Sequence, residues 1–170
     1  MSFFKSILLL FTIVLSCNTL ALTTINDSAN LGMLRNGITI KTNVAGTSKE
    51  GEFKDISRIS YGIGSPDAYG SEIAILSFYN THGRKLTLKA NSLFKVNDIK
   101  MEKICANNTC WFQISGLLES NDAKINTFNP AFRFDIIENS IPETIGELRK
   151  ILNYEFEFYY APGDEETIEL

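Results

Sequence analysis

The chain has 170 residues, with 20 acidic and 16 basic side chains and a formal net charge of −4. This acidic balance argues against a nucleic-acid-binding role, which needs a basic face, and against docking on anionic lipid headgroups. A single histidine and three cysteines leave few groups for catalysis or metal binding.

Residues 1–21 have the layout of a secretory signal. Lys5 is followed by an apolar run, and Thr19 and Ala21 place small residues where a signal peptidase reads them. The apolar run is shorter than the roughly 20 residues of a stable membrane anchor. We therefore predict cleavage after Ala21 and an exported protein in the periplasm or the extracellular space.

A second reading of the same segment involves the lipoprotein-like stretch Val14-Leu15-Ser16-Cys17. In this alternative Cys17 would be acylated and would anchor the protein to a membrane. A membrane association is expected only in that case. We expect residues 22–163 to form a single β-rich domain, which is an ordinary domain size, and residues 164–170 to form an acidic tail.

The first half of this domain shows one clear strand. Residues 22–37 are polar and turn-rich, and residues 38–44 then alternate and are rich in β-branched side chains, which predicts a strand. Residues 45–52 are expected to form a polar loop. The apolar spacing in residues 53–61 fits either a strand or a short helix.

The middle of the chain predicts a loop followed by a hairpin. Residues 62–70 are rich in glycine and are expected to form a loop. Residues 72–79 are apolar on both faces, which indicates a central strand. Residues 85–90 alternate, with Leu86, Leu88 and Ala90 inward, so we expect them to pair with 72–79 across a turn at residues 80–83.

A second hairpin is predicted over residues 99–118, together with its register. A two-residue turn at Asn107-Asn108 pairs Cys105 with Cys110 at a Cα separation that a disulfide accepts. An even number of cysteines after cleavage also favours a disulfide in an oxidising compartment.

The same register assigns the two faces of this hairpin. It places Met101 opposite Ile114 and Lys103 opposite Phe112. Phe112, Ile114 and Leu118 then share the core face, and Trp111 lies on the other face beside Ile104.

The last third of the domain predicts a strand, a helix and a final strand. Residues 131–137 alternate, with Phe132, Phe134 and Ile136 inward. A helix capped by Ser140 and ended by Asn153 is expected next, with its apolar face formed by Ile145, Leu148, Ile151 and Leu152. Residues 154–160 return to a period of two, with Glu155 and Glu157 facing water.

Taken together, these patterns predict a mainly β fold. We expect an antiparallel β-sandwich or small barrel with one C-terminal α-helix followed by a last strand.

The sequence offers no catalytic constellation, cofactor motif or metal-ligand set. His82 falls in a predicted turn without the neighbouring nucleophile and carboxylate that a catalytic histidine needs. Zinc would lack nitrogen and sulfur ligands once Cys105 and Cys110 are bonded. We therefore expect a protein that is not an enzyme and that holds no cofactor or metal.

Candidate binding residues are Trp111 on the disulfide-closed hairpin and Tyr61, Asp67 and Tyr69 in or next to the 62–70 loop. They favour a non-enzymatic module that acts through a protein surface, in an adhesion, inhibitor or envelope-associated role. Its partner would be a protein, a carbohydrate or a small apolar ligand. The alternative is a lipocalin-like carrier of a lipid or small apolar ligand, because antiparallel strands followed by a helix and a last strand are broadly that layout.

Overall fold

The structure is a computed structural model that describes residues 22–50, 55–62, 73–106, 109–137 and 141–161. The predicted leader, the possible lipid site at Cys17 and the acidic tail lie outside these residues, so all three stay predictions. Within the described residues, no helix has the length and apolar character needed to cross a bilayer.

The described elements are mostly strands. In chain order they are η1 (Leu31–Met33), β1 (Thr39–Thr42), β2 (Gly46–Thr47), β3 (Lys49–Glu50), β4 (Ile56–Gly62), β5 (Ile73–Tyr79), β6 (Thr87–Leu88), β7 (Ser92–Ala106), β8 (Thr109–Ser120), α1 (Ala123–Asn126), β9 (Ala131–Ile137), α2 (Ile145–Ile151) and β10 (Phe156–Tyr159).

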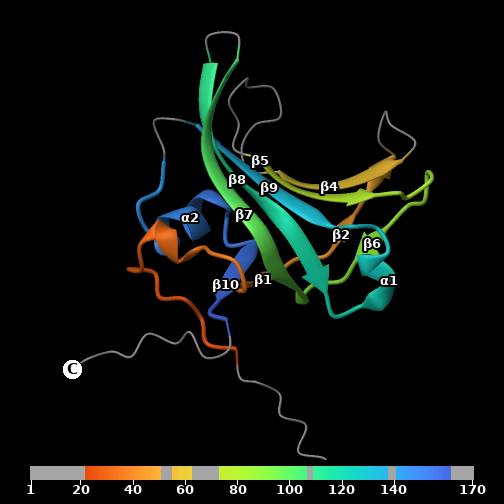
Figure 1. The fold of residues 1–170 in the computed structure, drawn as a ribbon, viewed down its shortest axis with the longest axis horizontal. Helices are drawn as coiled ribbons and strands as arrows, with labels where there is room; N and C mark the ends of the chain where they lie inside the picture. Colours follow the sequence, from red (N-terminus) through yellow and green to blue (C-terminus); the bar gives the residue numbers. More distant parts are fainter. Residues whose placement is uncertain (1–21, 51–54, 63–72, 107–108, 138–140, 162–170) are drawn as a thin grey trace, which may run out of the picture.

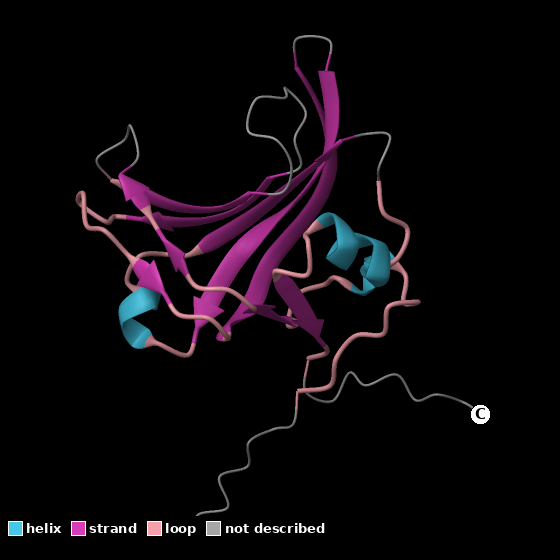
Figure 2. Ribbon diagram, turned by 180° about the vertical axis from the view of Figure 1, so that it is seen from behind, coloured by secondary structure: helices cyan, strands magenta, loops and turns pink. Residues whose placement is uncertain are grey.

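Eight of these strands form one antiparallel sheet that curls into a half-barrel. Its order is β10-β1-β7-β8-β9-β5-β4-β3, and β2 and β6 form a separate two-stranded sheet. The predicted mainly β fold, with a late helix and a last strand after it, is confirmed. Figures 1 and 2 show α2 and α1 at opposite ends of the sheet.

The strands β7 and β8 form a long hairpin that rises beyond the rest of the sheet (Figure 1). Its predicted register is confirmed, because Cys105 pairs with Cys110, Lys103 with Phe112 and Met101 with Ile114. A register shift between Asn97 and Lys100 marks a bulge lower in β7. Bulges of this kind bend a strand and increase its twist.

One face of the sheet carries the core, and we call it the inner face. Phe134 lies at the centre of it, fully buried, with its ring 5.0 Å from that of Phe132, 5.1 Å from Phe156 and 6.4 Å from Phe158. Ile114 of the hairpin and Leu148 of α2 join the same cluster. Because every second residue of a strand faces inward, the other face of the sheet, the outer face, carries the intervening side chains.

The expected hairpin between residues 72–79 and 85–90 is wrong. The strand β5 pairs with β4 on one side and β9 on the other, which leaves it no free edge. The short strand β6 pairs with β2 instead, and Ala90 is exposed rather than inward. An alternating pattern identifies a buried face, but it does not choose the partner strand.

The segments that were expected to be irregular, or whose structure was ambiguous, also differ from the prediction. Residues 22–37 were expected to be polar and turn-rich, yet Ile25, Leu31 and Leu34 are buried in the core. The expected loop 45–52 includes the short strands β2 and β3, and the ambiguous segment 53–61 forms most of β4. Their apolar residues are isolated or irregularly spaced, so they give no period to interpret.

The last helix begins later than expected. Its N-cap is Thr144, whose hydroxyl accepts from the backbone N–H of Glu147, and not the predicted Ser140, which lies outside the described residues. Both residues start a Ser/Thr-x-x-Glu pattern. The tertiary structure selects Thr144, because Thr144 has extended backbone angles and forms a bridge with Asn30. The predicted buried face is confirmed at Ile145, Leu148 and Leu152.

Candidate functional site

The outer face of the sheet carries the residues that best fit a binding site. Across β7, β8, β9, β5 and β4 the outward side chains form rows that are fixed by the pairing register. Near the hairpin tip the row contains Ile104 and Trp111, and farther down the sheet it contains Lys100, Ser115 and Arg133. From Trp111 to Leu117, six residues along β8, this face spans roughly 20 Å.

The tip of the hairpin is closed by the disulfide between Cys105 and Cys110, whose Cα atoms lie 4.1 Å apart. This confirms the predicted bond and its cross-strand position. The bond joins residues that the register already holds opposite each other. It therefore fixes the local shape of the hairpin end.

Reduction of this disulfide is expected to loosen the hairpin end and leave the rest of the fold in place. Its short loop limits the stabilisation to about 2 kcal/mol or less. The only tryptophan of the chain, Trp111, is next to Cys110 and should report the change by its fluorescence. A loss of far-ultraviolet circular dichroism across the whole protein on reduction would contradict this expectation.

Trp111 lies off the core face beside Ile104, as predicted, and it pairs in register with Ile137 on its other side. It is half-buried rather than exposed. Its indole Nε1 is buried and has no hydrogen-bond partner among the described residues. Because this nitrogen is buried, it offers no accessible donor to a ligand in this arrangement.

A network of polar side chains follows Trp111 down the outer face. Gln113 donates from Nε2 to Asp135 Oδ1 at 2.7 Å, and Arg133 contacts the other oxygen of that carboxylate through Nε at 2.9 Å. Lys100 forms an ion pair with Asp98 at 3.6 Å. The contacts of Asp135 connect side chains of β8 and β9, whereas the Lys100–Asp98 pair lies within β7 and is exposed.

Below this network the outer face is hollowed, and we call this feature the outer hollow. Its volume is about 240 Å³. It is lined by Arg58, Ile75, Ser77, Tyr79, Asp98, Lys100, Ser115, Gly116, Leu117, Ala131, Phe132 and Arg133. Tyr79 and Leu117 are 40% and 51% exposed.

The other predicted binding residues do not join this surface. Tyr61 lies on β4 with its side chain inward, 4% exposed, and its ring packs against Phe156 at 4.9 Å. We therefore leave Tyr61 out of the proposed surface. Asp67 and Tyr69 lie outside the described residues, and a role for the 62–70 loop stays a prediction.

Tyr61 is instead one of the described residues that have a buried polar atom without a hydrogen-bond partner. Its hydroxyl, the Thr42 hydroxyl and one Glu155 carboxylate oxygen are buried without a hydrogen-bond partner among the described residues. Burial, together with the Glu155 charge, raises the pKa of Tyr61 to about 12. Burial likewise raises the pKa of Glu155. The expectation that Glu155 and Glu157 simply face water is wrong, because one Glu155 oxygen is buried and Glu157, 25% exposed, pairs with Arg149.

Glu155→Gln is expected to stabilise the protein at pH 7. Because the folded-state pKa of Glu155 is raised, the folded protein holds its proton more tightly than the unfolded chain, and stability falls as the pH rises above about 4.5. The gain from the substitution should vanish at lower pH. Denaturation curves at several pH values measure it.

Glu157→Gln, two residues along, is the matched control and should destabilise, because Glu157 is the ion-pair partner of Arg149. Equal effects of the two substitutions at pH 7 would contradict the assignment.

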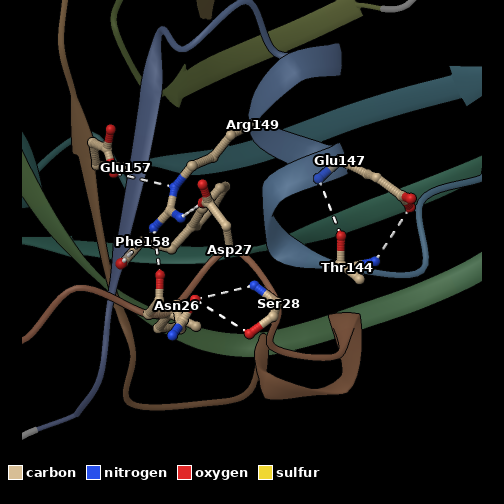
Figure 3. A network of polar contacts seen from close by, with 9 residues as sticks. Asn26, Asp27, Ser28, Thr144, Glu147, Arg149, Glu157 and Phe158 are labelled. Atoms are coloured by element: carbon tan, nitrogen blue, oxygen red, sulfur yellow. Dashed lines mark hydrogen bonds and ion pairs between the residues drawn. The ribbon is translucent and has the colours of Figure 1, made fainter.

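Sequence reasoning missed Arg149, which is 5% exposed and joins three parts of the chain (Figure 3). Its guanidinium donates to Asp27 Oδ1 and, at 2.7 Å, to the Ile25 carbonyl. Its Nε lies 3.2 Å from Glu157 Oε2, an ion pair whose angles fall short of a hydrogen bond.

Backbone contacts support this junction. Gly146 of α2 donates from its N–H to the Asp27 carbonyl at 2.9 Å, and a Cβ on Gly146 would lie 2.8 Å from the Asp27 Cβ. Ile25 donates to Phe158 of β10 at 2.9 Å. The N-terminal segment is thus held against both the helix and the edge of the sheet. We interpret this junction as structural.

The one histidine, His82, lies in the turn after β5, where its φ is 49°. Its Nδ1 is 3.4 Å from Asp55 Oδ1, and both side chains are at least 70% exposed. Among the described residues, no group of three or more His, Cys, Asp or Glu side chains is placed to hold a metal ion.

Comparisons of the chain with protein families, with curated proteins and with solved structures find no match. We therefore infer the function from the geometry of the outer face.

Proposed function

We propose that the protein is an exported, non-enzymatic binding module that contacts its partner through the outer face of the sheet. The observation that carries the proposal is the outer hollow, where exposed Tyr79 and Leu117 lie beside charged and hydroxyl side chains. Mixed surfaces of aromatic, aliphatic and arginine side chains are typical of protein interfaces.

Two features support export. The Cys105–Cys110 disulfide fits an oxidising compartment, where such bonds persist. The described pairing of the domain also includes Thr23, two residues after the predicted cleavage point, because its carbonyl accepts from the Tyr160 N–H at 2.9 Å. A mature chain starting at Leu22 would keep this contact.

The rigidity of the outer face supports a role in recognition. The face is built on strands, and its polar side chains are held by the contacts of Asp135 with Gln113 and Arg133. A pre-organised surface loses less conformational entropy when it binds. The partner proposed for it is another protein.

The carrier alternative has one observation in its favour, the unpaired polar atoms of Thr42, Tyr61 and Glu155 inside the core. A carrier needs an internal cavity of several hundred Å³. The aromatic rings of the inner face instead lie in mutual contact around Phe134. We therefore rank surface binding first.

Photo-crosslinking in the native source tests the proposal. A photoreactive benzoylphenylalanine in place of Leu117, on the outer face, should form adducts with a partner protein. The same group in place of Tyr154, which is 54% exposed at the turn after α2, is the control. Equal labelling from the two positions, or adducts from position 154 alone, would contradict a binding role for the outer face.

A further inference from the structure

The outer hollow is cationic, although the chain as a whole is acidic. Arg58, Lys100 and Arg133 line it. Asp98, also in the lining, pairs with Lys100, and Asp135, which is not in the lining, pairs with Arg133. The formal net charge of the chain is −4. A cluster of cations in an acidic protein attracts anionic groups to one place on its surface.

Several hydrogen-bond donors in the hollow have no acceptor among the described residues. Within the described part of the chain, the Arg58 side chain makes no hydrogen bond or ion pair, and neither do the hydroxyls of Ser77 and Ser115. Arg133 is bound through Nε to Asp135, which leaves its two terminal nitrogens available. Guanidinium groups bind carboxylates through two parallel hydrogen bonds. These side chains therefore suit an acceptor group that carries negative charge.

The size and surroundings of the hollow indicate which kind of ligand carries the negative charge. Its volume of about 240 Å³ is below the 300–1,000 Å³ of ordinary ligand pockets. It suits a single acidic side chain. Tyr79 and Leu117 beside it are exposed large side chains that the residues flanking such an acid would cover. A free small anion would leave them in water.

We propose that the outer hollow binds a glutamate or aspartate side chain of an acidic segment on another protein. Arg58 and Arg133 contact the carboxylate, and Tyr79 and Leu117 pack against its neighbours in that segment. This inference rests on the proposed function and specifies the chemistry of its partner.

Fluorescence anisotropy with a labelled decapeptide of alternating Glu and Ser tests the inference. A peptide with Gln in place of each Glu is the ligand control. The Glu peptide should bind more tightly, and Arg58→Gln should weaken that binding about tenfold or more, as expected for loss of a charge-assisted hydrogen bond. Arg84→Gln removes an exposed arginine that does not line the hollow and should leave the affinity unchanged.

Equal affinity for the two peptides, or an Arg58→Gln protein that binds like the original, would overturn the inference. Competition with inorganic phosphate distinguishes an acidic side chain from a free small anion as the ligand. If phosphate displaces the peptide with comparable affinity, the hollow is a small-anion site and the acidic segment is the wrong partner. Crosslinks from position 117 without binding of the Glu peptide would overturn this inference alone, whereas absence of those crosslinks would overturn the proposed function.

Discussion

Arg149→Met is expected to lower the free energy of unfolding by about 3 kcal/mol. The substitution keeps the apolar stem of the side chain but removes donors to Asp27 and to the Ile25 carbonyl. Glu157, whose side chain is 25% exposed, loses its ion-pair partner. The Asp27 side chain is 70% exposed and stays hydrated, which keeps the effect at the lower end of the range for buried pairs.

Chemical denaturation of the variant measures this effect. Lys150→Met is the matched control, because Lys150 is the next residue of α2 and is exposed. It should change the free energy of unfolding by less than about 0.5 kcal/mol. Equal effects of the two substitutions would show that Arg149 does not hold the N-terminal segment in place.

Phe134→Ala is expected to cost about 3–5 kcal/mol, the range for removing a buried aromatic side chain. Phe134 is fully buried, and its ring contacts those of Phe132, Phe156 and Phe158. It thus joins β9 to β10, which lie four positions apart in the sheet order. The substitution would therefore weaken the packing of the whole inner face.

Tyr154→Ala serves as the comparison, because Tyr154 is also aromatic but is 54% exposed. Its substitution should cost less than about 1 kcal/mol. Thermal or denaturant unfolding of both variants gives the difference. A small effect of Phe134→Ala would contradict a single packed core on the inner face.

The hairpin of β7 and β8 shows what the sequence alone determines. The predicted Asn107-Asn108 turn and the two cysteines require the same register, and that register then places residues 101–106 and 109–114 on their faces. Both signals are local, so no distant contact was needed to interpret them. The inward face of β9 follows in the same way from its alternation.

Distant contacts decide the features that the sequence did not reveal. The start of α2 depends on pairing with Asn30, and the partner of β6 depends on which strand edges are already occupied. The sequence contains one indication that Arg149 is buried. Positions 145, 148, 149 and 152 have the spacing of a single helical stripe. A cation within an apolar stripe indicates a buried polar contact, although it does not identify the partner.

Predicting the outer hollow requires the order of the strands in the sheet as well as the face on which each residue lies. Arg58, Arg133 and Lys100 come from β4, β9 and β7, which are distant in sequence. Alternation places Arg133 and Lys100 outward, whereas Arg58 lies in the segment 53–61, whose spacing was ambiguous. Only the order β7-β8-β9-β5-β4 brings them to one surface.

The central claim is that the protein binds through its outer face and not through its interior. Native mass spectrometry of the protein purified gently from its own source tests this most directly. We expect a chain that starts at Leu22, carries the Cys105–Cys110 disulfide, and appears bare or in complex with another protein. A small apolar molecule bound one-to-one and retained in the gas phase would contradict it and would assign binding to the interior.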